Sequence, residues 1–146
     1  MGKSEPVFEH ADAIERGLLD IGRASKASGV SVKMIRHYEE IGLLTNVART
    51  HANYRVYTGK DIHTLRFIKR SRALGFSMHD IRELLALWQN KSRPSASVKK
   101  IAAGHMQDLK RRIQEMQSMV ATLEHLTHNC HGDTRPECPI LEDLAR

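Results

Sequence analysis

The feature that most constrains the fold is a long heptad pattern in the second half of the chain. Beginning with Ser95 as a helix cap and running to about Thr127, the apolar residues recur at alternating steps of three and four: Met106, Leu109, Ile113, Met116, Val120, Leu123 and Leu126 or Thr127. Such spacing over about three heptads is typical of a coiled coil. A helix of more than thirty residues is about 45 Å long, which is too long for a compact monomer. The pattern predicts a dimerisation helix, most simply about a twofold axis. Packing against the chain's own N-terminal half is the alternative.

A short loop directly after this helix holds the only two cysteines of the chain, Cys130 and Cys138. Gly132 and Pro136 predict a turn here rather than a helix or strand. Pro139 suits the first position of a short helix, which places Cys138 at the N-cap. Thiolates at a helix N-terminus are stabilised by the unpaired N–H groups and the helix dipole. We therefore expect the loop to hold two deprotonated sulfurs close together.

The donor set of this loop favours a soft monovalent ion. Thiolates select Cu(I), Ag(I) and Au(I), and two sulfurs satisfy a linear d¹⁰ ion, whereas Zn²⁺ usually takes four ligands. Two alternatives stay open. A divalent ion would need further ligands, for which His125, His128 and His131 are candidates. A disulfide between Cys130 and Cys138 would instead make the loop a switch that responds to oxidants.

The positive charge of the chain is concentrated in its middle. Residues 21–93 carry fourteen Lys and Arg against five Asp and Glu, whereas residues 1–20 have a balance of −3 and residues 94–146 a balance of zero. A basic block of this kind is typical of nucleic-acid binding, with a solvated basic face as the alternative.

The remaining patterns exclude several classes of protein. No run of about 18 apolar residues predicts a membrane span, and no signal peptide is apparent, so we expect a cytoplasmic protein. Two cysteines in an intracellular chain favour a metal or redox role over a structural disulfide. No nucleophile–base–orienter set, phosphate loop or paired acidic constellation points to an enzyme.

Two short helices joined by a glycine turn are predicted at the start of the basic block. The first begins at Ile21 and ends at Gly29, and the second is capped by Ser31 and runs over Val32–Ile41. Such a pair forms a helix-turn-helix, with an ordinary helical hairpin as the alternative. Its small core is expected to consist of Ala24, Ala27, Val30 and Ile35. The second helix can enter a major groove, and it is expected to present outward Lys33, Arg36, His37 and Tyr38.

A small β-hairpin, or wing, is predicted over Arg49–Tyr57. Alternating residues form its strands, and Ala52-Asn53 can turn because Asn tolerates a positive φ. Donors for phosphate oxygens are expected from Arg49, Tyr54, Arg55 and Tyr57. The alternative is that both tyrosines pack the hairpin onto the helices, and we expect one of them to do partly that.

A second pair of helices follows, opening at Lys60-Asp61, with a stop at Gly75 and a cap at Ser77. We expect this helix-turn-helix-like pair to support the first pair rather than to read DNA. The chain then divides into four predicted parts. These are a flexible or loosely helical extension over 1–19, a winged-helix DNA-binding domain with the second pair over 20–93, a dimerisation coiled-coil helix over 94–128, and a metal-binding loop with a terminal helix over 129–146.

Together these motifs resemble a known family. The stretch Ile21–Tyr57, with Arg36-His37-Tyr38-Glu39, Gly42-Leu43 and Asn53-Tyr54-Arg55-Val56-Tyr57, is similar to the winged-helix head of MerR-type transcription regulators. The second helix pair, with Arg72, Gly75 and Phe76, the long helix and the terminal loop fit as well, so the resemblance spans about residues 19–144. The stretch Cys130…Cys138-Pro139-Ile140 is similar to the copper-responsive CueR- and HmrR-like branch.

The resemblance implies a mainly α fold and a homodimer joined by an antiparallel coiled coil. It implies an activator that occupies promoter DNA with or without its metal, works with RNA polymerase, and controls copper efflux and detoxification genes. The metal-bound form would bend and untwist a promoter whose elements are poorly spaced, so that DNA deformation starts transcription.

The resemblance also implies roles for individual residues. By position, the residues that match the DNA-contacting pattern are Lys33, Arg36, Tyr38, Arg49, Tyr54, Arg55 and Tyr57. Cys130 and Cys138 match the metal-binding thiolates for Cu(I), with Ag(I) and Au(I) as alternatives. Ser95 falls where divalent-metal sensors of the family usually carry a third cysteine, which implies a monovalent ion. The chain departs from the family at the Ala52-Asn53 turn and in its N-terminal extension.

Overall fold

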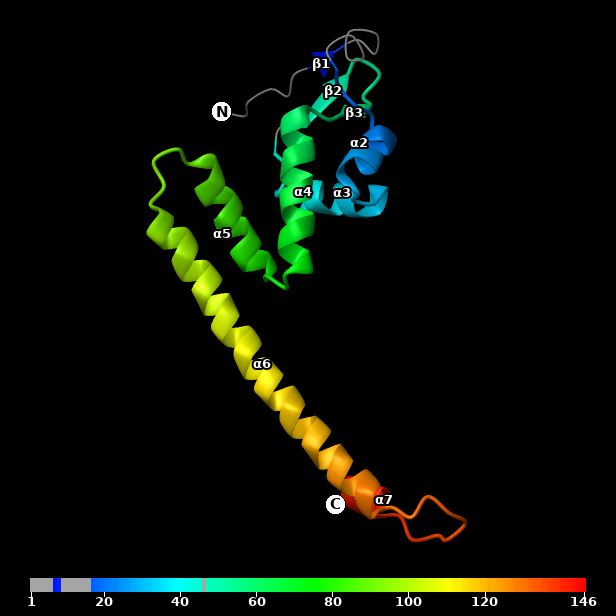
Figure 1. The fold of residues 1–146 in the computed structure, drawn as a ribbon. Helices are drawn as coiled ribbons and strands as arrows, with labels where there is room; N and C mark the ends of the chain where they lie inside the picture. Colours follow the sequence, from blue (N-terminus) through cyan, green and yellow to red (C-terminus); the bar gives the residue numbers. More distant parts are fainter. Residues whose placement is uncertain (1–6, 9–16, 46) are drawn as a thin grey trace. The chain divides into compact units, whose positions relative to one another are not determined.

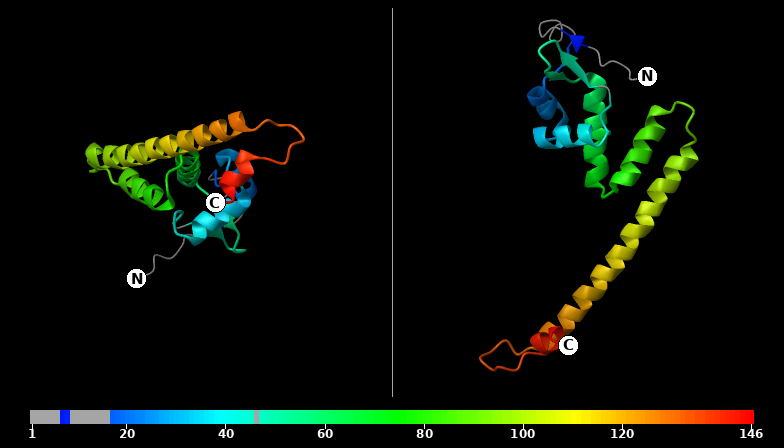
Figure 2. Two further views of the ribbon diagram at one scale, coloured as in Figure 1. Left: turned by 90° about the horizontal axis from the view of Figure 1, so that it is seen from below. Right: turned by 180° about the vertical axis from the view of Figure 1, so that it is seen from behind.

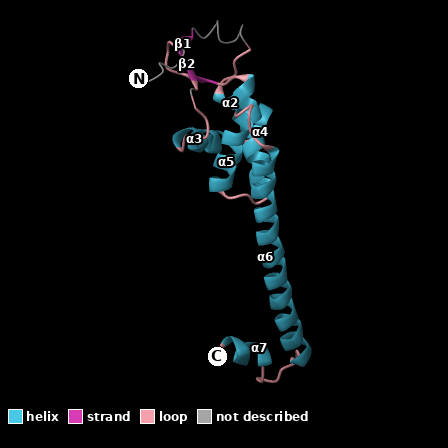
Figure 3. Ribbon diagram, turned by 90° about the vertical axis from the view of Figure 1, so that its left-hand side faces the viewer, coloured by secondary structure: helices cyan, strands magenta, loops and turns pink. Residues whose placement is uncertain are grey.

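The computed structural model describes residues 7–8, 17–45 and 47–146. It divides into two compact units that meet between Arg93 and Pro94. We call the first unit the head and the second the rod unit. The head contains β1 (Val7–Phe8), α2 (Ile21–Ser28), α3 (Val32–Glu40), β2 (Ala48–Thr50), β3 (Arg55–Val56), α4 (Gly59–Ala73) and α5 (Met78–Gln89) (Figure 1). The rod unit contains α6 (Ser95–Asn129) and α7 (Pro139–Leu144). The fold is mainly helical, as expected (Figure 3).

Local capping signals form the helix-turn-helix of α2 and α3. The carboxylate of Asp20 accepts a hydrogen bond from the N–H of Arg23 at 2.8 Å and so starts α2. Gly29, with φ of 74°, takes the left-handed conformation that ends this helix. The hydroxyl of Ser31 then accepts from the N–H of Met34 at 3.2 Å and starts α3. The predicted helix-turn-helix is confirmed.

The core of the head lies where α2, α3, α4 and α5 meet. Ala24, Val30 and Ile35 are buried as predicted, while Ala27 packs at the edge of this core. Tyr38, which we expected to face outward, is only 3% exposed. It lies three residues after Ile35, on the same face of α3, so its ring follows the core face of the helix.

Helix α4 is the centre of the head, with α2 on one side and α5 on the other (Figure 2). It begins with a capping box. The Thr58 hydroxyl accepts from the N–H of Asp61 at 3.2 Å, and the Asp61 carboxylate accepts from the N–H of Thr58 at 2.9 Å. The rings of Phe67 and Trp88 stack with their centroids 4.9 Å apart and so join α4 to α5.

A three-stranded sheet in the order β1-β2-β3 contains the wing. Strands β2 and β3 are antiparallel, with Arg49 opposite Arg55, and Asn53 turns the chain between them with φ of 67°. The predicted hairpin is therefore confirmed. Strand β1 pairs in parallel with β2, with Val7 opposite Arg49. The prediction of a flexible or loosely helical N-terminal extension is thus wrong for residues 7–8, because their backbone completes the edge of β2. Residues 1–6 and 9–16 lie outside the described residues.

Helix α6 is 35 residues long and extends two residues beyond the predicted Thr127. Its N-cap is Pro94, with no side-chain hydrogen bond, so the prediction that Ser95 caps this helix is wrong. Ser95 already has helical geometry and is the first residue of the helix. None of the helices in the described ranges combines the length and hydropathy needed to cross a bilayer.

The heptad positions form an apolar stripe along α6 that no other described part of the chain buries. About half of the surface of Ile113, Val120 and Leu123 is exposed, and Met116 is 62% exposed. An uncovered apolar surface of this extent indicates a protein partner, and the heptad spacing predicts that this partner is a second copy of α6.

Replacing Ile113 with Asp should prevent the predicted dimer from forming. The substitution places an unpaired charge in the apolar stripe of each copy, which costs at least about 3 kcal/mol. Gln114→Asp is the matched control, because it adds the same charge one residue along, off the heptad positions. Sedimentation equilibrium should show a monomer for Ile113→Asp and a dimer for the control. A dimer for both variants would mean that another surface holds the copies together.

Candidate nucleic-acid interface and metal-binding loop

Helix α3 presents a basic face to solvent. Lys33, Arg36 and His37 are exposed, whereas Ile35 and Tyr38 face the core. The Ser31 cap fixes where the helix begins, and the two buried side chains fix its rotation against the head. This arrangement leaves a rigid helix with one positively charged side, as required for entry into a DNA groove.

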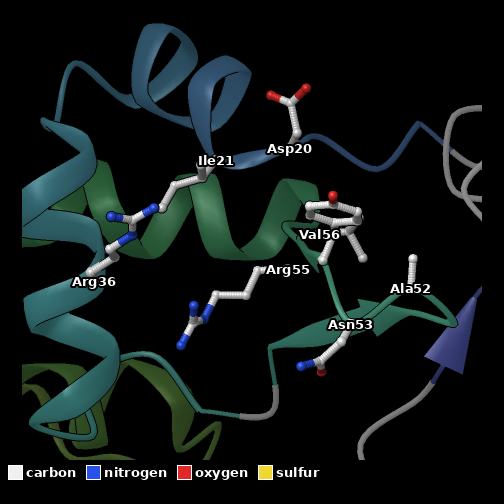
Figure 4. A pocket seen from close by; sticks show the side chains of 8 residues that line it. Asp20, Ile21, Arg36, Ala52, Asn53, Arg55 and Val56 are labelled. Carbon is white, nitrogen blue, oxygen red and sulfur yellow. The ribbon is translucent and has the colours of Figure 1, made fainter.

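A cleft of about 500 Å³ lies between this helix, the start of α2 and the wing (Figure 4). Arg36 enters it from α3 and Arg55 from β3, so two guanidinium groups from different elements line one cavity. The other lining residues are Asp20, Ile21, Ala52, Asn53, Tyr54 and Val56. Convergent guanidinium groups of this kind are suited to binding phosphate oxygens.

The tip of the wing exposes the predicted phosphate donors unequally. Tyr54 is 68% exposed, whereas Arg49 and Arg55 are half-buried. The Arg49 guanidinium donates to the Asn53 side-chain oxygen at 3.3 Å, which braces the turn. Arg55 donates through Nε to Oε1 of Glu39 at 2.9 Å. The two arginines therefore support the shape of the wing as well as its charge.

Tyr38 and Tyr57 are buried, which departs from their expected place among the surface DNA contacts. The Tyr38 hydroxyl accepts from Nη1 of Arg72 at 3.0 Å, and the Tyr57 hydroxyl donates to Oε2 of Glu39 at 3.4 Å. Burial and the neighbouring Glu39 charge raise the pKa of Tyr57 above its usual value, so it stays a neutral donor. Both rings therefore contribute to the core of the head and not to its exposed surface.

Several basic residues of the central block prove to be structural. Arg66 donates to the carbonyl of Ala27 at 3.1 and 2.8 Å, and Arg82 donates to the carbonyl of Ile41 at 2.9 Å. These bonds satisfy carbonyls at the ends of α2 and α3. The charge count alone did not distinguish such arginines from those on the exposed face of α3.

The two cysteines lie at the two ends of one loop in the rod unit. Cys130 is the C-cap of α6, and Cys138 is the N-cap of α7, as predicted from Pro139. Both are free thiols and half-buried. Helix α7 packs back against the end of α6, so the helices bring both ends of the loop together (Figures 1 and 2).

A solvent-exposed ion pair lies within the loop between the cysteines. The Asp133 carboxylate accepts from the backbone N–H of Arg135 at 2.9 Å and from its Nε at 2.7 Å. These bonds hold the pKa of Asp133 below its usual value. Gly132, with φ of 65°, takes a left-handed conformation that few other residues adopt at low cost. Both features act within the loop, at its exposed surface.

The other sequence-predicted ligands are less closely placed. His125 is hydrogen-bonded to the Asn129 side chain at 3.2 Å. Across the described ranges, no three His, Cys, Asp or Glu side chains are grouped to hold a metal ion. Ser95 is exposed at the opposite end of α6, and 35 helical residues separate the ends by about 50 Å. Within one chain, Ser95 therefore cannot share an ion with the cysteine loop.

Comparison with known proteins gives matches over the head and most of α6. The family model described as "MerR HTH family regulatory protein" matches residues 19–88, and the model "MerR, DNA binding" matches residues 62–126. The transcriptional regulator HmrR of Sinorhizobium medicae is 55% identical over 128 residues, covering 88% of this chain and 87% of that protein. The regulator CueR of Salmonella typhimurium is 36% identical over 127 residues, covering 87% and 92%.

A solved structure gives the same assignment for the fold. It is that of the transcription regulator PbrR691 from Ralstonia metallidurans CH34, in complex with lead(II). The two chains are 30% identical and superpose with a TM-score of 0.77, covering 86% of this chain and 98% of the other.

Replacing Arg36 with Ala should weaken binding to duplex DNA about tenfold and reduce the salt slope of the affinity by about 1, since one phosphate contact is lost. The probe is a fluorescent duplex that the wild-type protein selects from a random-sequence pool. Lys100→Ala, which removes one exposed positive charge from α6, should leave the slope unchanged. An equal affinity for the Arg36 variant and the wild type would remove Arg36 from the interface.

Proposed function

The chain belongs to the MerR family of helix-turn-helix regulatory proteins, and on this basis we propose that it is a heavy-metal-dependent transcription regulator that senses Cu(I). Ag(I) and Au(I) are the alternative ions, because they share the preference for two thiolates. Members of this family bind promoter DNA as dimers, and they are regulators, not enzymes. The sensing residues we propose are Cys130 and Cys138.

The observation that carries the proposal is the placement of these two thiols. They are half-buried and lie at the two ends of one loop, between α6 and α7. A soft d¹⁰ ion fits this donor set, since two thiolates complete a linear coordination sphere. When bound, the ion would supply a cross-link between the ends of α6 and α7. The chain's own contribution would be to shield both sulfurs partly from solvent and to place them at the two ends of one loop.

Selectivity between monovalent and divalent ions would depend on Ser95. An antiparallel pairing of two copies of α6 would bring the start of one helix, with Ser95, beside the cysteine loop of the other. A hydroxyl there is a poor ligand for a soft ion and supplies no third thiolate. The serine therefore supports a site with two ligands and a monovalent ion.

The DNA-binding residues that we propose are those the structure leaves accessible in the head: Lys33, Arg36, Arg49, Tyr54 and Arg55. We assign Tyr38 and Tyr57 to the support of this surface, because both are buried. The regulator would activate genes for copper efflux and detoxification by distorting the promoter for RNA polymerase, since contacts from two heads to the DNA backbone can offset the cost of deformation.

Helix α7 offers a means of transmitting the metal signal. Leu141 and Leu144 are 66% and 69% exposed, although this short helix directly follows a proposed ligand. Metal binding would order the loop and let these leucines dock on α6 or on the partner's head. The angle between the two DNA-bound heads would change as a result.

The test is a metal titration under anaerobic, reducing conditions, with a competing chelator that sets the free-ion level. Transcription is measured from a promoter that carries the selected duplex between its −35 and −10 elements. We expect one tightly bound Cu(I) per cysteine loop, activation by Cu(I), and none by Zn(II). Activation by zinc would identify a divalent sensor, and activation by oxidant without metal would identify a thiol switch.

Cys130→Ser and Cys138→Ser should each abolish activation by Cu(I), because a single thiolate cannot complete the linear site. DNA affinity should stay within about twofold of wild type, since the head does not contain the loop. Equal losses of DNA binding and metal response would contradict the assignment of DNA binding to the head and of metal sensing to the cysteine loop.

Ser95→Cys should add a third thiolate to each proposed site and so give the regulator a response to Zn(II) or another divalent ion. Ser97→Cys, two residues further along α6, is the matched control for the added thiol. Zinc-dependent transcription in the first variant alone is the expected result. The same zinc response in both variants would show that position 95 has no special relation to the loop.

A further inference from the structure

We propose that Glu39 is a positioning residue for DNA binding, which holds Arg55 of the wing in the cleft that it shares with Arg36 of α3. The proposal rests on the DNA-binding function proposed above and extends it to a residue outside the predicted contact set. It also assigns a role to a negative charge that lies on the DNA-binding face of the head, where such a charge would otherwise be unfavourable.

The contacts of Glu39 connect the helix to the wing at two points. Its side chain is only 16% exposed, and Oε1 accepts from Nε of Arg55 at 2.9 Å. The second oxygen, Oε2, accepts from the hydroxyl of Tyr57 at 3.4 Å. Arg55 begins β3, and Tyr57 directly follows that strand. One carboxylate therefore fixes both ends of β3 to α3.

A wing this short needs an anchor of this kind. Strand β2 has three residues and β3 has two, so the hairpin depends on contacts beyond its own two strands, and the backbone bridge between Leu19 and Tyr57 is one of them. Tyr57 is fully buried, and its raised pKa keeps it a hydrogen-bond donor at physiological pH. The neutral Tyr57 hydroxyl can donate to one carboxylate oxygen while the other binds Arg55, so Glu39 can restrain Arg55 before DNA arrives. Restraining a long side chain in advance lowers the entropy lost on binding.

General electrostatics and positioning predict opposite effects of removing this charge. A carboxylate near the phosphates repels them, so its removal should strengthen DNA binding if charge alone mattered. If Glu39 instead holds Arg55 in place, its removal should weaken binding even though the net charge becomes more positive. A rise in DNA affinity on removal of the charge would indicate repulsion alone, and a fall would indicate that Glu39 positions Arg55.

The experiment compares Glu39→Gln with Glu40→Gln in the full-length protein. Both variants lose one negative charge from the same helix, but Glu40 is exposed and Glu39 is not. In Glu39→Gln the amide oxygen can still accept from Tyr57, while the ion pair with Arg55 is lost. Affinity for the duplex selected by the wild-type protein is measured at several salt concentrations, with the active fraction determined by stoichiometric titration.

We expect Glu39→Gln to bind about five- to tenfold more weakly, with the salt slope reduced by about 1, because Arg55 no longer reaches its phosphate reliably. Glu40→Gln should bind as tightly as wild type or more tightly, with no loss of slope. A partly unfolded variant would instead show a smaller DNA-binding fraction in the titration, with the salt dependence of the affinity unchanged. Tighter binding by both variants would overturn the proposal.

A second comparison tests whether Glu39 acts through Arg55. In the Arg55→Gln background, Glu39→Gln should cause no further loss of affinity, since the side chain that it positions is absent. A further loss of the same size would overturn the proposal. Glu39→Asp keeps the charge on a shorter side chain and should also weaken DNA binding. This variant replaces Glu39→Gln in the experiment if Glu39→Gln does not fold. Failure of the wild type to bind any duplex would overturn the proposed function as well.

Discussion

The apolar stripe of α6 is the constraint on which the rest of the architecture depends. Ile113, Met116 and Val120 lie on a helix with no buried residue, so their burial requires a partner. A second copy in antiparallel orientation would satisfy the heptad spacing, place two heads on one duplex, and bring each cysteine loop to the start of the partner helix. DNA binding and metal sensing would then be linked through a single apolar surface.

Within the head, the basic residues divide into two groups with different tasks. Arg66 and Arg82 bind the carbonyls at helix ends, and Arg72 binds the Tyr38 hydroxyl, so their charges hold the fold together. Arg36 lies on the exposed side of α3 and is available to a ligand. Arg55 belongs to both groups, because it is bound by Glu39 and still lines the cleft. The shape of the DNA-binding surface therefore depends on acidic and buried partners as much as on positive charge.

Much of the fold could be predicted because its signals are local. Asp20, Ser31 and Ser77 cap helices through hydrogen bonds to residues three positions away, and Asn53 turns the wing through its own backbone preference. The cysteine spacing and Pro139 placed the loop between two helix ends in the same way. The errors concern longer-range effects. Pairing of residues 7–8 with β2 depends on a strand edge some forty residues away, and the orientation of Tyr38 depends on the packing of four helices.

The sequence by itself determined the helices, the wing and the two thiols at the ends of one loop, because caps, turns and heptads act between neighbours along the chain. Only the tertiary structure decided which donors remain accessible. It buried Tyr38 and Tyr57, committed Arg66 and Arg82 to backbone carbonyls, and brought Glu39 against Arg55. These assignments depend on which side chains the folded head encloses, and enclosure is a property of packing between distant segments that no local pattern records.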